Sequence, residues 1–208
     1  MELSSELPRR SLVRRAMLLE SAIISYNIAE GVISIIAGIV AGSVVLVGFG
    51  LDSAIEVSAA LVVLFHLSRS GEEVQPAWEQ RVAQFVGLTL LLVAAYVLGR
   101  SIYNLLTESR PEESYIGIGV TAASLVIMPL VSRMQFRYTM KINSIALRAD
   151  SRETLVCTYL SAATLLGLGA NALLGWWWAD PVAGLVLVFF IAREGREIFK
   201  NRELICVD

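Results

Sequence analysis

The sequence has little histidine, little cysteine and almost no excess of charge. It holds one histidine, two cysteines and a formal net charge of -2 over 208 residues. Near-neutral charge argues against a nucleic-acid partner, because such binding depends on clustered Lys and Arg. Two cysteines do not make a disulfide framework. One histidine, with no serine–histidine constellation, argues against a membrane-embedded hydrolase or a histidine-rich metalloenzyme. We therefore expect a protein that is not an enzyme and has no prosthetic group.

Apolar residues are abundant instead. They make up 56% of the chain, with a mean hydropathy of +0.66, whereas soluble domains hold about 45–50%. A membrane crossing takes about 20 apolar residues, and the first apolar run is too long for the core of a signal peptide. The pattern predicts an all-α integral membrane protein with six transmembrane helices, at residues 16–40, 44–67, 80–106, 115–133, 144–173 and 182–199.

Basic residues gather in the segments on one side of the predicted membrane. Lys and Arg are frequent near the N-terminus, in the loops after the second and fourth runs and near the C-terminus, whereas Arg110 stands almost alone on the other side. This asymmetry is typical of cytoplasmic segments. It predicts cytosolic N- and C-termini in a multi-pass protein of the inner cell membrane. We divide the chain into a cytosolic lead (1–15), a six-helix membrane domain (16–200) and a short cytosolic tail (201–208).

Two acidic residues lie inside the second apolar run. Asp52 and Glu56 are four positions apart, which places both carboxylates on one face of a helix. At the bilayer centre each costs roughly 2.5–3.5 kcal/mol, which the surrounding Val, Ile, Leu and Phe residues offset. The helix can therefore insert, but insertion does not explain the acids. Their burial without a cation nearby in the sequence indicates a ligand: a proton, a metal ion or a basic partner.

The fifth apolar run carries a second pair with the same spacing, Glu153 and Cys157. At 1.5 Å rise per residue, both pairs fall within a turn or two of the middle of the bilayer. Two facing helices then offer three carboxylates and one thiol, which is a suitable four-ligand shell for a divalent metal. The thiolate favours softer ions such as zinc, while the carboxylates keep manganese and iron as alternatives.

Plainer interpretations exist for the same side chains. The paired acids are also explained as proton-relay groups or as ion-pair partners of Arg148 and Arg152, which lie near the cytosolic end of the fifth helix. Cys157 taken alone is best explained as a small buried hydrophobic residue, and only its register with Glu153 suggests a ligand. Asp150 is expected at the membrane interface or as a group that supports the ligands.

Polar residues also occur in the first predicted helix. Asn27 and Glu30 are three positions apart, and either form a proton-linked or ligand-supporting network or pair between helices. Glu20 is expected at the interface. The same is expected of His66, the single histidine, at the cytosolic end of the second helix.

Four segments together resemble the membrane domain of the cation diffusion facilitators. They are 27–31 (NIAEG), 42–53 (GSVVLVGFGLDS), 146–153 (ALRADSRE) and 179–181 (ADP). The resemblance covers nearly the whole chain, including the order of six helices. It implies a homodimeric exporter of zinc, manganese, iron or related ions in exchange for protons. It also implies a transport site of two residues four apart on each of the second and fifth helices, which here are Asp52, Glu56, Glu153 and Cys157.

The chain departs from the commonest pattern of that family. Glu56 follows Asp52 on the second helix, and Glu153 and Cys157 stand where histidine and aspartate are usual. The histidine-rich loop and the cytosolic C-terminal domain of many relatives are not seen in this sequence. The chain therefore resembles a minimal member, and any dimer is expected to form through the membrane helices.

The expected function is export of a divalent transition metal from the cytosol in exchange for protons. Zinc is the first expectation, with manganese and iron as alternatives. The rival interpretation is a membrane protein that binds or senses metal without transporting it, which the same ligands would serve. A structural scaffold has no reason to bury two aligned pairs of polar residues.

Overall fold

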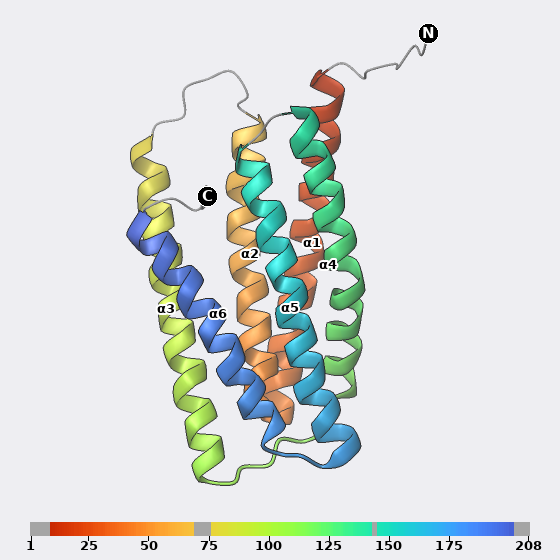
Figure 1. Ribbon diagram of the computed structural model, residues 1–208, viewed down its shortest axis with the longest axis vertical. Helices are drawn as coiled ribbons and strands as arrows, with labels where there is room; N and C mark the ends of the chain where they lie inside the picture. The colour runs from red at the N-terminus through yellow and green to blue at the C-terminus, as the bar shows by residue number, and fades with distance from the viewer. Residues whose placement is uncertain (1–8, 69–75, 143–144, 202–208) are drawn as a thin grey trace.

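The computed structural model describes residues 9–68, 76–142 and 145–201, and these residues form six helices (Figure 1). The helices are α1 (Arg9–Ala41), α2 (Val44–Ser68), α3 (Pro76–Leu106), α4 (Tyr115–Ile142), α5 (Ile145–Leu174) and α6 (Ala179–Asn201). Helices α1 to α5 are each long and apolar enough to cross a membrane. Helix α6 alternates charges through its second half, including Arg193, Arg196 and Glu197, which shortens its apolar stretch. The predicted all-α membrane fold is confirmed.

Several helices run further than the sequence predicted. Helix α1 begins at Arg9 instead of residue 16, and α4 continues to Ile142 through residues expected to form a connector. The hydropathy pattern marks where apolar residues give way to charged ones, but an α-helix can continue through charged residues. Residues 130–142 contain neither Gly nor Pro, so nothing in the local sequence stops α4 at the membrane surface.

Basic side chains mark one end of the bundle. The start of α1, the end of α4 and the start of α5 all lie there, at the top of Figure 1. We call this the basic end, after the exposed Arg10, Arg14, Arg133, Arg137 and Lys141.

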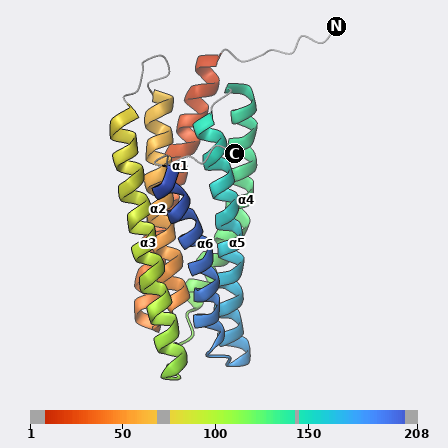
Figure 2. The same cartoon turned by 60° about the vertical axis from the view of Figure 1, so that its left-hand side comes forward.

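Helix α2 occupies the centre of the packing. Helix α1 packs mainly on α2, α4 on α5, and α3 on α6, while α2 also contacts α3, α5 and α6. Figure 2 shows α6 lying between α3 and α5. The apolar stretch of α2 is 67% buried inside the chain, against 28% for those of α3 and α4, which leave much more surface for lipid. Polar groups on α2 are therefore shielded by protein and not by lipid.

Glycine allows α1 and α2 to approach closely. Gly42, at a φ of 67°, forms the turn between the two helices. Further along, a Cβ atom added to Gly50 would lie 2.9 Å from the backbone oxygen of Gly31, which is closer than side chains tolerate. Small residues at such a contact let two backbones meet within a membrane. Polar side chains of α1 can therefore reach α2.

The start of α2 is held by a residue from the start of α6. The Asp180 carboxylate accepts a hydrogen bond from the Val44 backbone N–H at 2.9 Å and a second from the Ser43 hydroxyl. Asp180 is fully buried. A carboxylate at a helix N-terminus satisfies unpaired N–H groups and complements the helix dipole. This contact fixes the position of α2 relative to α6.

Candidate metal site

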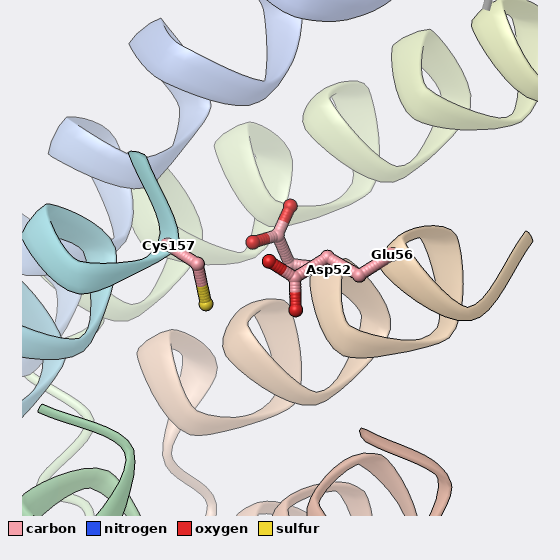
Figure 3. A group of neighbouring side chains, drawn as sticks. All are labelled: Asp52, Glu56 and Cys157. Carbon is pink, nitrogen blue, oxygen red and sulfur yellow. The ribbon is translucent and has the colours of Figure 1, made fainter. Parts of the chain in front are cut away.

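Two carboxylates from α2 and a thiol from α5 meet inside the bundle. Asp52, Glu56 and Cys157 each offer one ligand atom, and these three atoms lie within 4.8 Å of one another. Figure 3 shows both carboxylates turned toward the Cys157 sulfur. Asp52 is 5% exposed and Cys157 is 2% exposed. The i, i+4 spacing on α2 sets the acid pair on the helix face that meets α5.

The cluster lies at mid-depth in the bundle. Asp52 is eight residues into the 25-residue helix α2, and Cys157 is twelve residues into the 30-residue helix α5. At 1.5 Å per residue, both residues are more than about 10 Å from either end of their helices. Three of the four ligands that the sequence predicts are therefore brought together at one level.

The fourth predicted ligand, Glu153, has a side chain outside the part of the chain that the structure describes. Its role remains a prediction. The same holds for the side chains of His66, Arg148 and Arg152.

Asn27 ties the first helix to the cluster. Its side-chain Nδ2 donates a hydrogen bond of 3.0 Å to Oε2 of Glu56. Asn27 is 2% exposed, and its own Oδ1 has no hydrogen-bond partner. The geometry matches the ligand-supporting interpretation of Asn27, which at the same time pairs α1 with α2.

Glu30 lies beside the cluster and is held by hydroxyl groups. It accepts hydrogen bonds from the Tyr26 hydroxyl at 3.1 Å and from the Ser53 hydroxyl at 3.0 Å. Ser53 directly follows Asp52, so Glu30 is linked through one residue to the candidate ligands. Glu30 is buried, at 2% exposure, and it stands one turn from Asn27 on α1.

Asp150 and Glu20 share one hydrogen-bond donor inside the bundle. Both are buried, and both accept hydrogen bonds from the Gln135 side-chain amide. Glu20 is enclosed by protein, and α1 begins two turns before residue 16, while its expected place at the membrane interface stays a prediction. Sequence reasoning missed Gln135 altogether. It belongs to a buried face of α4 that repeats every three or four residues, Thr121, Ser124, Met128, Ser132, Gln135 and Thr139.

The donor atoms define what the cluster can bind. Two carboxylates balance the charge of a divalent cation, and the sulfur adds a softer donor. Cation binding is therefore the chemistry that these side chains fit.

The fold and this cluster define a multi-pass membrane protein with a buried candidate cation site. A family model described as the cation efflux transmembrane domain matches residues 22–203. The chain therefore belongs to the cation efflux family, a family of transporters and not of enzymes. Its several apolar helices and its bacterial relatives identify it as a multi-pass protein of the cell membrane.

Individual relatives are similar over much of the chain. An uncharacterized transporter of Synechocystis sp., sll1263, is 27% identical over 169 residues, covering 78% of this chain and 54% of that protein. The cation-efflux pump FieF of Salmonella typhi is 27% identical, covering 91% and 65%. The manganese efflux system protein MneS of Bacillus subtilis is 26% identical, covering 81% and 60%. The chain thus spans 54–65% of the length of these three relatives.

Proposed function

We propose that the chain moves a divalent transition-metal cation out of the cytosol in exchange for protons. The metal ligands in this proposal are Asp52, Glu56, Glu153 and Cys157. The observation that carries it is the meeting of three potential ligand atoms within 4.8 Å at mid-depth of a membrane-spanning bundle. Membership of the cation efflux family supports the transport step.

Zinc is the cargo that the donor set favours. A thiolate with carboxylates suits zinc in tetrahedral geometry, and thiolate ligands select softer ions. Manganese and iron remain as alternatives, since carboxylates bind both. One similar protein is named a manganese efflux system protein, which keeps manganese in the comparison.

Exchange for protons follows from the ligand chemistry. Carboxyl and thiol groups must lose their protons to bind a metal, so metal binding releases protons and metal release allows the same atoms to take protons up. Asp52 and Glu56 would carry protons on the return step, when the emptied site faces inward again. Asn27 would hold Glu56 in position during both steps through its 3.0 Å hydrogen bond.

Orientation and assembly complete the proposal. The basic end would face the cytosol, as the positive-inside rule requires. Metal would then enter from that end and leave from the opposite one. We further propose a homodimer formed through the membrane helices, whose exposed apolar faces are available for contact.

The test is metal-driven proton movement in vesicles that contain the purified chain and a pH-sensitive dye. Zinc, manganese, iron, cobalt and cadmium are compared, in the unchanged chain, in Asp52→Asn and in Glu112→Gln. Glu112 is an exposed acid in the connection between α3 and α4 and serves as the matched control. We expect one ion to move protons in the unchanged chain and the control but not in Asp52→Asn.

Two other outcomes decide against parts of the proposal. Normal flux in Asp52→Asn would refute the ligand assignment. Stoichiometric metal binding without proton movement for any ion would instead favour a membrane protein that binds or senses metal, and it would leave the site standing without the transport.

A further inference from the structure

A second group of buried polar side chains lies between the basic end and the candidate metal site. It consists of Glu20 on α1, Gln135 on α4 and Asp150 on α5, and we call it the Gln135 cluster. The Gln135 Nε2 donates to Oε1 of Glu20 at 3.2 Å and to Oδ2 of Asp150. Glu20 and Gln135 are fully buried, and Asp150 is 6% exposed.

Several oxygen atoms in and beside the Gln135 cluster have no partner. They are Oε2 of Glu20, Oε1 of Gln135 and the hydroxyl of Thr139, which is one turn beyond Gln135 on the same face of α4. Leaving one buried polar group unpaired costs about 1–3 kcal/mol. Two of these atoms, the carboxylate oxygen of Glu20 and the amide oxygen of Gln135, can only accept, and the two carboxylates share the Gln135 amide as donor. The Gln135 cluster therefore offers more acceptors than donors. A metal cation would remove this surplus, because it bonds to oxygen and carries positive charge.

We propose that the Gln135 cluster is a second cation site, with oxygen ligands and a preference for a hard divalent ion such as Mn²⁺. The carboxylates of Glu20 and Asp150 supply the charge. A half-turn of the Gln135 amide places its Oε1 where its Nε2 now lies, between the two acids, and so converts a donor into a third ligand. Carboxylate and carbonyl oxygens suit Mg²⁺, Ca²⁺ and Mn²⁺, whereas a thiolate selects softer ions.

The second site shares helix α5 with the first, and its α1 residue lies on the helix that carries Asn27, the hydrogen-bond partner of Glu56. Asp150 precedes Cys157 by seven residues on α5, and Glu20 precedes Asn27 by seven on α1. Seven residues are two helical turns, so each pair lies on one face about 10 Å apart along the helix. The two sites are therefore stacked, with the Gln135 cluster nearer the basic end. Its place on a cytosolic entry route rests on the proposed function, but its ability to bind a cation does not.

The test counts metal ions bound to the full-length chain in detergent, with two probes. One equivalent of Cd²⁺ is added to occupy the thiol-containing site, which the ultraviolet absorbance of the cadmium–thiolate bond reports. Mn²⁺ is then titrated and counted by electron paramagnetic resonance. We expect one Mn²⁺ per chain in the unchanged protein and in Glu112→Gln. In Glu20→Gln and Asp150→Asn we expect Mn²⁺ affinity to fall at least tenfold, with the cadmium signal kept.

Asp52→Asn separates this proposal from the proposed function. It should weaken the cadmium signal and keep the Mn²⁺. If Mn²⁺ binding disappears in Asp52→Asn, or persists at full strength in Glu20→Gln and Asp150→Asn, the second site is refuted. If instead the unchanged protein gives no cadmium–thiolate signal while Mn²⁺ binding depends on Glu20, the central ligand assignment fails and the second site stands.

A charge-gain variant covers the case in which Glu20→Gln or Asp150→Asn does not fold. Gln135→Glu replaces the bridging amide with a third carboxylate, which a hydrogen-bonding role would not tolerate but a cation site would. We expect Mn²⁺ to raise the melting temperature of Gln135→Glu by more than it raises that of the unchanged chain. No shift on adding Mn²⁺ to the unchanged chain would overturn the proposal, since a purely structural network gains nothing from the ion, whereas Gln135→Glu adds a ligand that the unchanged chain lacks.

Discussion

The candidate metal site and the Gln135 cluster are built differently, although both are buried groups of acids. Asp52, Glu56 and Cys157 come from two helices and combine carboxylates with sulfur. The Gln135 cluster takes one side chain from each of three helices and offers oxygen alone. The first therefore has the donors for a soft or borderline ion and the second those for a hard one. The comparison teaches that donor type, more than the number of acids, separates the two sites.

The largest expected difference between them is in transport. Asp52→Asn removes a ligand where the metal must stay bound during the crossing, so flux should fall about 100-fold or more. Glu20→Gln changes a site that the metal passes on its way to the candidate metal site. We therefore expect this variant to keep the maximal flux and to need an about tenfold higher metal concentration for half-maximal flux. Flux measured against metal concentration in vesicles distinguishes the two, with Glu112→Gln as the control. Equal loss of maximal flux in both variants would contradict the assignment of different roles in transport to the two sites.

The second prediction concerns ion preference. Cys157→Ser keeps the size of the side chain but replaces sulfur with a hard, neutral oxygen. Zinc and cadmium affinity at the candidate metal site should fall by at least about tenfold, which is about 1.4 kcal/mol, while Mn²⁺ affinity changes little. Titration calorimetry on the purified chain measures both. A uniform loss for all ions would mean that Cys157 acts through packing and not as a ligand.

The sequence predicts one of these two groups and not the other, and the reason is their spacing. Asp52 with Glu56 is an i, i+4 pair within an apolar run, which is visible without a structure. Cys157 was found by its register with Glu153, and the structure places it against the α2 pair. The Gln135 cluster has no such pattern, because its members lie on three different helices, with Glu20 115 positions and Asp150 15 positions from Gln135. Only packing of α1 and α5 on α4 brings them together.

The fold was likewise predictable only in part: the sequence predicts the helical bundle but not where each helix ends. Six long apolar runs with short connections leave few arrangements other than a helical membrane bundle. The ends of the helices were not predictable, since α4 continues past its predicted end at residue 133 to Ile142. That extension matters, because it makes helical the segment that carries Gln135 and Thr139. An error of nine residues at the end of α4 therefore hid the second group.

The third prediction tests how the two groups depend on the contact between α1 and α2. In Gly50→Ala, the new methyl group would lie 2.9 Å from the Gly31 backbone oxygen, so the helices must separate. Overpacking of this kind costs about 1–3 kcal/mol. We expect a lower melting temperature and weaker cadmium binding, because Asn27 then moves away from Glu56, and a smaller change at the Gln135 cluster.

Gly99→Ala is the matched control for that variant. Gly99 is also inside a helix, α3, but a methyl group there meets nothing within 4 Å. The substitution should be neutral or stabilising by up to about 1 kcal/mol, since alanine favours the helix more than glycine. If both alanine variants behave alike, the close approach of α1 and α2 does not hold the candidate metal site in shape.

The smallest effect is expected from two threonines on the buried face of α4. The Thr121 hydroxyl donates to the Gly117 carbonyl at 2.8 Å, whereas the Thr139 hydroxyl, beside the Gln135 cluster, has no partner. Replacing a paired hydroxyl costs about 0.5–1.5 kcal/mol, and replacing an unpaired one is close to neutral or stabilising. Thr121→Val should therefore lower the melting temperature without metal, and Thr139→Val should not. With Mn²⁺ present, Thr139→Val should melt at a lower temperature than the unchanged chain. The unchanged chain gains stability from an ion that Thr139 helps to hold. If Mn²⁺ stabilises Thr139→Val as much as it does the unchanged chain, the hydroxyl is no ligand and the second site consists of Glu20, Gln135 and Asp150 alone.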